Sequence, residues 1–246
     1  METTRRQHFN HVDSTQRIAL SLARSGAAPG SVVVADRQDD GRGRLDRRWE
    51  SPEGGLYLSV LLPLPASGAT LLPLAMGSAL ADSLGPYSAR PLLKWPNDLL
   101  VVDPPRPARK LAGVLVDAVP DAPAGATAVV GVGVNVNSSP VDYPMPLRAR
   151  VVQLSELAGR EVPLDELERT ILAALALAAD RLATRDGRDE TLAECRARLF
   201  GRGQGVVVDG RPSGTIEDLD DDGALVICEG NARRHLLAGD VRVEGM

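Results

Sequence analysis

The chain of 246 residues contains very little cysteine, histidine and lysine. Its two cysteines, Cys195 and Cys228, are too few and too isolated for a disulfide framework or a zinc site. Neither an H-E-x-x-H zinc motif nor a G-x-S-x-G hydrolase motif is present, and no G-K-[ST] completes a Walker loop. The sequence therefore indicates neither metal catalysis by a side-chain cluster, nor a serine hydrolase, nor a P-loop enzyme.

A basic field is also missing, because the formal net charge at pH 7 is −5. Such a chain is poorly suited to bind DNA or an anionic membrane surface. No apolar run approaches the ~18 residues of a membrane-spanning helix, and the first residues lack the apolar region of a signal peptide. We therefore expect a cytoplasmic protein that binds neither nucleic acid nor membranes.

Lysine is scarce even among the basic residues. All but two of the 28 basic residues are arginine, and the two exceptions are Lys94 and Lys110. A bias toward arginine codons explains the excess of arginine but not these two positions. Lysine provides a compact point charge, whereas arginine provides a broad planar fork. Lys94 and Lys110 are therefore candidates for sites at which arginine would not serve.

The pattern of apolar residues predicts an α+β architecture without internal repeats. Strands are expected at residues 31–38, 55–65, 90–97, 110–119 and 126–137, and helices at 15–26, 70–85 and between 164 and 200. Glycines then interrupt the pattern, and the short β-like segments that follow resemble a small barrel of the SH3 type. We predict a catalytic domain over residues 1–200 and a C-terminal β-barrel over 201–246 that docks on it.

A loop rich in arginine and glycine lies between the strands expected at 31–38 and 55–65. The segment DDGRGRLDRRWESPEGG, residues 39–55, contains Arg42, Arg44, Arg47 and Arg48, which repel one another unless an anion neutralises them. Glycine lets the backbone approach a ligand, and arginine donates paired hydrogen bonds to carboxylate or phosphate. Taken alone, the segment is equally consistent with an exposed charged hairpin.

Three further stretches suggest a binding site. DSTQ (13–16) places hydroxyl groups at a helix start, KWPND (94–98) ends a strand in a turn, and KLAGVLVD (110–117) opens a strand with a lysine. Individually they fit a helix N-cap, a turn and a buried strand. However, a turn alone does not require a lysine and a tryptophan at positions 94 and 95. In addition, Gly113 leaves room above the sheet for a flat ligand.

In this order and spacing, the stretches resemble the biotin protein ligases. Members of that family carry a GRGR-x-GR-x-W biotin-binding loop, then KWPND, then K-x-x-G-[IVL]-L and then G-[IVLA]-G-[IVL]-N. The corresponding residues here are 41–49, 94–98, 110–115 and 131–135. The resemblance extends from Val12 through the C-terminal barrel and implies the mixed-sheet fold of biotin/lipoate ligases. Lipoate ligases share that fold but not the arginine-rich loop.

The resemblance implies an ATP-dependent ligase that forms biotinyl-5′-AMP and passes biotin to one lysine of a biotin carboxyl carrier protein. Biotin is then the substrate, ATP the co-substrate with Mg²⁺ as its accompanying ion, and the carrier protein the partner. The resemblance also raises the expectation of a homodimer, for which the strand near 110–119 offers an apolar edge.

The resemblance further assigns roles to individual residues. The expected catalytic cations are Lys110, Arg42 and Arg44. The residues expected to bind biotin or its adenylate are Ser14, Thr15, Gln16, Gln38, Gly41, Arg42, Gly43, Arg44, Arg47, Trp49, Lys110 and Gly113. The residues expected on the ATP side are Lys94, Asn97, Asp98, Gly131, Gly133 and Asn135. The glycine-rich loop is expected to be mobile when empty and to close over the ligand.

Two positions depart from the usual family pattern. Asp46 stands where glycine is usual, and Gln16 stands where asparagine is usual. We expect the acid to pair with Arg47 or Arg48, and the longer amide to alter one contact with the ring of the ligand.

Three alternatives stay open: a lipoate or octanoyl transferase, a non-catalytic biotin-binding regulator, and a biotin-responsive repressor. The repressor is disfavoured because only 12 residues precede Asp13, too few for a DNA-binding domain of three helices.

Overall fold

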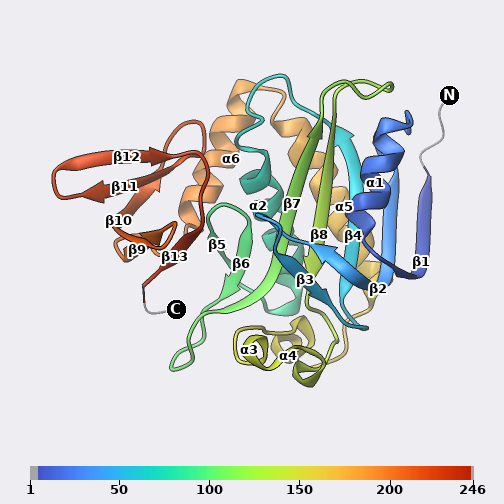
Figure 1. Ribbon diagram of the computed structural model, residues 1–246, viewed down its shortest axis with the longest axis horizontal. Helices are drawn as coiled ribbons and strands as arrows, with labels where there is room; N and C mark the ends of the chain where they lie inside the picture. The colour runs from blue at the N-terminus through green and yellow to red at the C-terminus, as the bar shows by residue number, and fades with distance from the viewer. Residues whose placement is uncertain (1–4, 245–246) are drawn as a thin grey trace.

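A computed structural model describes residues 5–244 of the chain, which form two β-sheets with helices around the larger one (Figure 1). The strands of the large sheet are β1 (Arg6–Val12), β2 (Val32–Arg42), β3 (Arg48–Ser51), β4 (Leu56–Pro63), β5 (Leu92–Lys94), β6 (Asp98–Val101), β7 (Arg109–Val119) and β8 (Thr127–Val134). Their order is β1-β2-β4-β8-β7-β6-β5, with β3 paired to β2. Strand β1 is parallel to β2, and the other pairs are antiparallel.

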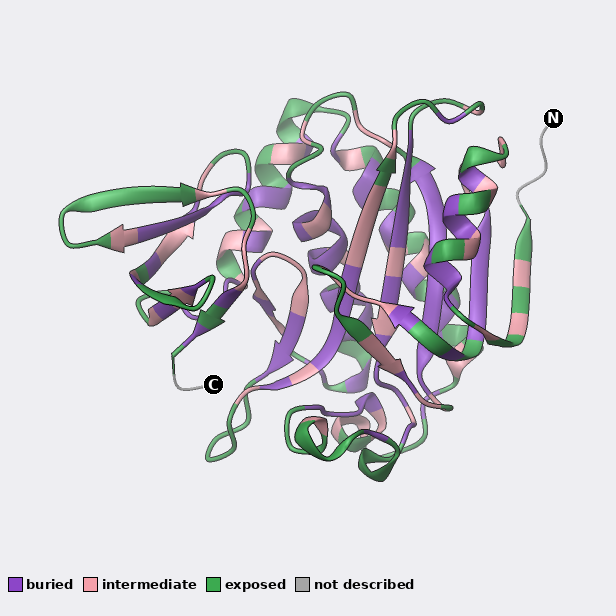
Figure 2. Ribbon diagram, viewed as in Figure 1, coloured by how far each residue is buried: buried purple, intermediate pink, exposed green. Residues whose placement is uncertain are grey.

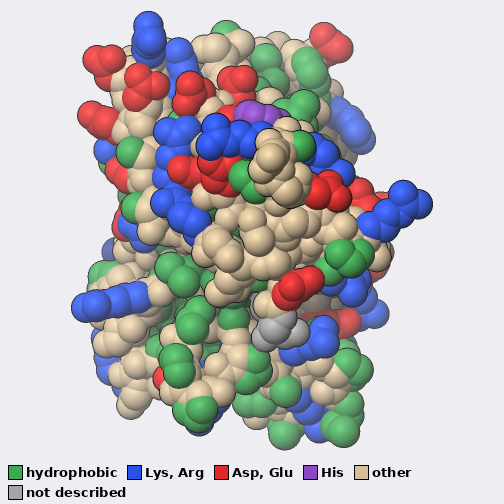
Figure 3. All heavy atoms as spheres, turned by 90° about the vertical axis from the view of Figure 1, so that its left-hand side faces the viewer, with side chains coloured by type: hydrophobic (Ala, Val, Ile, Leu, Met, Phe, Trp, Pro, Cys, Tyr) green, Lys and Arg blue, Asp and Glu red, His purple; other side chains and the backbone are tan. Residues whose placement is uncertain are grey.

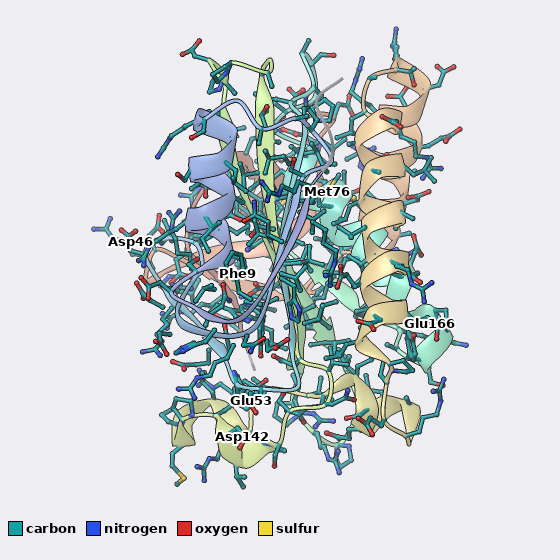
Figure 4. The ribbon with its side chains drawn as sticks, turned by 90° about the vertical axis from the view of Figure 1, so that its right-hand side faces the viewer. Phe9, Asp46, Glu53, Met76, Asp142 and Glu166 are labelled. Atoms are coloured by element: carbon teal, nitrogen blue, oxygen red, sulfur yellow. The ribbon has the colours of Figure 1, made fainter. Side chains whose placement is uncertain are left out.

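Helices cover both faces of the large sheet. The longer helices are α1 (Thr15–Arg24), α2 (Leu72–Leu84), α5 (Leu164–Arg181) and α6 (Arg185–Ala197). Figure 4 shows α1 on one face and α5 on the other, with Met76 of α2 between the sheet and α5. Because both faces are covered, seven of the eight residues of β4 are buried, and the central strands are rich in valine and leucine (Figure 2). None of the helices within residues 5–244 combines the length and the hydropathy that a membrane crossing requires.

Shorter helical segments connect these elements. They are the 3₁₀ helices η1 (Gly85–Tyr87) and η2 (Pro140–Asp142), and the α-helices α3 (Met145–Arg148) and α4 (Leu154–Ala158). Together η2, α3 and α4 form a cap below the ends of β7 and β8 in Figure 1. This cap positions part of the site described below.

The C-terminal segment forms the second sheet, which confirms the expected small β unit. Its strands are β9 (Gly205–Val208), β10 (Arg211–Leu219), β11 (Leu225–Glu229), β12 (Ala232–Leu236) and β13 (Val241–Val243), in the order β12-β11-β10-β9-β13. All pairs are antiparallel, and β12 and β13 lie at opposite ends of the order, so the barrel is not closed. Figure 3 shows that acidic and basic side chains are intermixed on the face at this end of the molecule.

The small sheet docks through buried contacts. Trp95 Nε1 donates to the carbonyl of Gly223 at 3.0 Å, and two nitrogens of the Arg196 side chain donate to the carbonyl of Leu219. A Cβ added to Gly223 would lie about 3 Å from side-chain atoms of Leu71, which directly precedes α2, and of Leu74, within α2. The two sheets therefore share one continuous apolar core.

Most expected elements are confirmed, with two local differences. The strand expected at 90–97 is two short strands, β5 and β6, which pair antiparallel around a turn. In addition, the arginine loop is shorter than expected, because β2 extends to Arg42 and the unexpected strand β3 pairs with it.

The edge strand β1 is attached by a partly buried ion pair, which gives a stability prediction. Arg6 donates two hydrogen bonds, of 2.7 and 2.8 Å, to the buried carboxylate of Glu168 in α5. Removal of Arg6 leaves that carboxylate buried and unpaired, so R6A should lower the free energy of unfolding by about 1–3 kcal/mol. Its exposed neighbour Arg5 is the matched control, and R5A should be neutral in urea denaturation. Equal effects of the two variants would contradict the role of this pair.

Candidate active site

The floor of the site is a part of the large sheet that carries no side chains. Gly113 of β7 and Gly133 of β8 are direct partners in the register. The indole of Trp49 from β3 lies on them: a Cβ at Gly133 would be 2.4 Å from Trp49 Cε2, and one at Gly113 would be 3.0 Å from Cζ3. Above this floor lies a cavity of about 150 Å³, which we call the central cavity.

One wall of the central cavity is a network of buried polar groups at the start of α1. Gln38 Oε1 accepts from the backbone nitrogen of Thr15 at 2.8 Å, and Gln38 Nε2 donates to Ser51 Oγ at 2.8 Å. Thr15 Oγ1 in turn lies 3.0 Å from Ser59 Oγ. Because each group holds the next, the wall is fixed before any ligand arrives.

The side chain of Gln16 extends this network across the sheet. Its Oε1 accepts from Ser59 Oγ at 2.9 Å, and its Nε2 donates to the carbonyl of Val129 and to Asp117 Oδ2, each at 3.0 Å. Every polar atom of the Gln16 amide is therefore engaged within the protein. Gln16, which stands where asparagine is usual, therefore connects this wall of the central cavity to Asp117 of β7. The sequence did not indicate this connection.

Two polar atoms of the cavity have no such partner. Ser14 Oγ and Trp49 Nε1 are buried, and neither has a hydrogen-bond partner within residues 5–244. Buried polar groups are normally satisfied, so each of these two atoms has a hydrogen bond that the described residues do not supply.

Both lysines of the chain lie at the site and share one carboxylate. Lys110 Nζ is 2.6 Å from Asp98 Oδ1 and 4.8 Å from the centre of a Trp49 ring. Lys94 Nζ is 3.8 Å from Asp98 Oδ2. Burial lowers the pKa of the Lys94 ammonium, and the charge of Asp98 opposes this effect. Asp98 therefore keeps two neighbouring ammonium groups in place despite their mutual repulsion.

The loop arginines are held by carboxylates from other elements. Arg42 Nη1 lies 3.3 Å from Asp117 Oδ2 of β7, and Arg47 Nη2 lies 2.5 Å from Asp240 Oδ2, just before β13. The Arg47 guanidinium accordingly lowers the pKa of the Asp240 carboxyl. The Arg47–Asp240 pair attaches the loop to the C-terminal unit.

The expectation that Asp46 pairs with Arg47 or Arg48 is wrong. Arg47 pairs with Asp240 and Arg48 with Glu50, whereas Asp46 makes no ion pair within residues 5–244. The physical reason is the backbone: Leu45 and Asp46 have φ angles of 54° and 55°, in the left-handed region. This turn directs Asp46 to the outside of the molecule, where Figure 4 shows it at the tip of the loop.

Arg44 is the exception among the loop cations. It makes no ion pair within the described residues, and burial lowers the pKa of its guanidinium. An arginine nevertheless stays charged in proteins. Arg44 therefore presents a positive charge without a direct ion-pair partner to the central cavity, which it lines.

A larger cavity of about 690 Å³ adjoins the lysine side of the site, and we call it the basic cavity. Its basic lining residues are Arg47, Arg48, Lys94, Lys110, Arg150 and Arg242, against the acids Glu50, Asp98 and Asp240. No group of three or more His, Cys, Asp or Glu side chains within residues 5–244 is arranged to hold a metal ion. The excess of positive charge suits a polyanion.

The structure brings together most residues singled out from the sequence. Those that line the central cavity are Ser14, Thr15, Gln16, Gln38, Arg42, Gly43, Arg44, Arg47, Trp49, Lys94, Asn97, Asp98, Lys110, Gly113, Gly131 and Gly133. Gly131 and Gly133, expected on the ATP side, thus lie in the central cavity, and they do not line the basic cavity.

Two expected residues, Gly41 and Asn135, lie outside the central cavity. A Cβ at Gly41 would be 2.5 Å from the carbonyl oxygen of Trp49, so glycine is needed for the close pairing of β2 and β3. Asn135 borders the basic cavity, but its amide donates to the carbonyl of Lys110 at 3.0 Å and accepts from the Tyr143 hydroxyl at 3.0 Å. Asn135 therefore fixes the backbone that carries Lys110.

Sequence reasoning missed three residues that support the site. Ser59 and Asp117 are single polar residues within apolar strands, LYLSVLLP and LAGVLVDAV, and that contrast could have identified them. Asp240 carries no comparable signal, because its partner Arg47 lies in the loop between β2 and β3, far away in the sequence.

Comparison with known proteins agrees with this geometry. A model of the biotin/lipoate A/B protein ligase family matches residues 9–135, and a model of the biotin protein ligase C-terminal domain matches residues 203–243. The chain belongs to the biotin/lipoate A/B protein ligase family. The first match contains the arginine loop and both lysines, and the second contains Asp240.

Curated relatives include ligases of similar length and longer proteins. The biotin--[acetyl-CoA-carboxylase] ligase of Mycobacterium tuberculosis is 34% identical over 93% of this chain and 85% of its own length. The Paracoccus denitrificans protein of the same name is 30% identical over 93% of this chain and 96% of its own length. The bifunctional ligase/repressor BirA of Bacillus subtilis is 33% identical, but the match spans about half of that relative, 49%.

Solved structures show the same fold. The biotin protein ligase from Aquifex aeolicus, in complex with biotin and ATP, superposes with a TM-score of 0.83 at 27% identity. The match covers 98% of this chain and 100% of that one.

The glycine floor leads to a prediction about Trp49. In G133A the new methyl group would lie 2.4 Å from the indole, which must move away from the sheet toward solvent. Tryptophan emission should then shift to longer wavelength, since the second tryptophan, Trp95, is only 4% exposed and the atoms nearest to a Cβ at Gly133 all belong to Trp49.

The matched control is G85A, because a Cβ at Gly85 meets nothing within 4 Å and its φ of −52° suits alanine. Unchanged emission in G133A, or an equal shift in G85A, would show that the indole does not rest on Gly133.

Proposed function

We propose that the protein activates biotin with ATP to form biotinyl-5′-AMP and then transfers the biotinyl group to a lysine of a biotin carboxyl carrier protein. The observation that carries this proposal is the convergence of Lys94, Lys110 and Arg44 on one cavity with a polar wall and an open floor. Membership of the ligase family supports it, as does the similarity to a ligase whose structure contains biotin and ATP.

Biotin occupies the central cavity in this proposal. Its ureido group can bond to Ser14 Oγ, which has no partner within residues 5–244, and to the wall formed by Thr15 and Gln38. Its apolar body packs against the indole of Trp49, which itself rests on the floor at Gly113 and Gly133. The carboxylate then points toward Lys110, where the central and basic cavities meet.

ATP occupies the basic cavity, with its α-phosphate near Lys110. Mg²⁺ is expected to arrive on the phosphates of ATP, because both oxygens of the nearest carboxylate, Asp98, face lysines. The Mg²⁺ ion would neutralise part of the phosphate charge. Asn97, whose amide donates to the carbonyl of Val114 at 2.7 Å, supports the turn that presents Asp98.

The chemistry requires two anions to approach each other. A biotin carboxylate oxygen attacks the α-phosphorus of ATP, and pyrophosphate leaves with the electrons of the broken bond. Lys110 and Arg44 lower the barrier by placing positive charge where negative charge accumulates. The loop between β2 and β3 excludes water from the mixed anhydride while the acceptor amine arrives.

Two further expectations belong to this proposal. A homodimer could form along β7, because β6 pairs with β7 only as far as Gly113 and leaves one edge of residues 115–119 without a strand partner in the described structure. The protein is also expected to act in the cytoplasm.

Exchange of radiolabelled pyrophosphate into ATP tests the proposed function directly. The purified protein should support exchange with biotin and not with lipoate or octanoate. Exchange with lipoate or octanoate instead would identify a different acyl ligase, and biotin binding without exchange would identify a regulator.

Lys110 provides the sharpest prediction for the activation step. K110A should reduce pyrophosphate exchange by a factor of about 10²–10³, because the charge acts mainly on the transition state. The affinity for biotin, measured by isothermal titration calorimetry, should fall by less than about tenfold, since the ureido contacts are intact. K110R keeps the charge and serves as the conservative control, with a loss smaller than that of K110A. Equal losses of affinity and exchange in K110A would contradict this role.

A further inference from the structure

A third cavity, of about 280 Å³, adjoins the central cavity and is lined by neither lysine. Its walls are the loop residues 42–46, residues 95–97, residues 114–117 of β7, the turn at 222–224, residues at the start of α2, and Leu237, which follows β12. The central cavity shares the loop residues 42–45, residues 95–97 and residues 114–115 with it, so the two cavities meet at the base of the loop. The activation step described above uses no part of this third cavity beyond that shared wall.

The charges of this cavity differ from those of the basic cavity. It contains three carboxylates, Asp46, Asp117 and Asp222, and only two arginines. One of these arginines, Arg42, is already paired with Asp117 at 3.3 Å. The basic cavity has six basic residues against three acids. We therefore call the third cavity the acidic cavity.

Apolar side chains accompany the carboxylates. Leu45 and Leu237 are 61% and 75% exposed, which is unusual for leucine, and both border the acidic cavity. Pro73, Leu74 and Val114 add further apolar wall. A passage with apolar walls and carboxylates matches the two parts of a lysine side chain, a hydrocarbon stem and an ammonium head.

We propose that the acidic cavity is the entrance for the acceptor lysine, and that Asp46 and Asp222 attract its ammonium group. The proposal rests on the proposed function, in which a lysine must reach an adenylate that occupies the central and basic cavities. The basic cavity is then filled by the nucleotide, and its positive charge repels an ammonium group. The acidic cavity also adjoins the central one, and a nucleotide in the basic cavity leaves it open to the acceptor.

The transfer step balances without another reactant. The lysine nitrogen forms a bond with the biotinyl carbonyl carbon, the bond from that carbon to the phosphate oxygen breaks, and AMP leaves with its electrons. The arriving ammonium loses two protons to water during this sequence. The carboxylates of the entrance therefore act on the encounter and not on the bond change, and their effect should weaken with salt.

Asp46 is a departure from the family pattern that the loop resembles. Glycine is usual there in the family that the loop resembles, and the φ of 55° explains why glycine fits. An aspartate tolerates this conformation better than most residues and adds a charge at the mouth of the acidic cavity. Asparagine tolerates it equally, so D46N removes the charge without changing the backbone requirement.

The test compares a charged and an uncharged nucleophile on the enzyme-bound adenylate. The enzyme is loaded with biotin and ATP, separated from excess ligand, and mixed with Nα-acetyl-L-lysine methylamide or with hydroxylamine, which is uncharged at neutral pH. The measured quantity is the ratio of the two single-turnover rates, divided by the same ratio for free biotinyl-5′-AMP in solution. For the unaltered protein this normalised ratio should exceed one and fall as salt is added.

The double variant D46N/D222N should lower the normalised ratio by at least about threefold, the effect of one or two exposed ion pairs. The matched control is D221N, which removes the same charge from the same turn. Asp221 does not line the acidic cavity and pairs with Arg196 at 3.0 Å, so the normalised ratio of D221N should equal that of the unaltered protein.

An unchanged normalised ratio in D46N/D222N, or an equal fall in D221N, would overturn the proposal that the acidic cavity is the entrance for the acceptor lysine. Failure of the proposed function is distinguishable, because the unaltered protein would then form no adenylate from biotin and ATP.

Discussion

The site depends on one constraint: the centre of the large sheet carries no side chains. Gly113 and Gly133 are paired across β7 and β8, and the Trp49 indole lies where side chains would otherwise stand. A methyl group at either glycine would come within 3.0 Å of the indole. The open floor thus lets the arginine loop fold back over the sheet, and it brings the loop within reach of Lys110. Without it, the polar wall and the cations would face a filled sheet surface rather than a cavity.

Most cations of this site form ion pairs with carboxylates from distant segments of the chain. Asp98 holds both lysines, Asp117 holds Arg42, and Asp240 holds Arg47. These pairs explain how an acidic chain keeps so many cations in one place. An incoming carboxylate or phosphate therefore replaces a protein carboxylate as the partner of an arginine or lysine that is already held in place. The ligand does not have to order a free side chain. Exchange of this kind limits the entropy lost on binding, because the cations are already close to their positions.

The sequence was sufficient for the parts of the molecule that depend on local pattern. Alternation and apolar runs predicted β7 and β8, and the order of four short motifs indicated which loops converge. Pairings between distant segments were not accessible. β3 was missed because its four residues, RWES, are too few and too polar to show a strand pattern, and only pairing with β2 makes the segment extended. The partner of Asp46 was wrong because a left-handed turn, invisible in composition, directs this side chain outward. Asp240 could not be foreseen, since its role arises from the docking of the second sheet.

The placement of Lys94 and Lys110 on one carboxylate has a consequence for chemical labelling. Most proteins offer many surface lysines to acylating reagents, and their modification reports little about function. In this chain every side-chain amine belongs to the ligand site. Acylation of lysine by a general reagent, followed by peptide mass mapping, would therefore give a footprint of site occupancy alone. The same property makes amine coupling a poor choice for immobilising this protein on a surface, because lysine attachment would block the site itself.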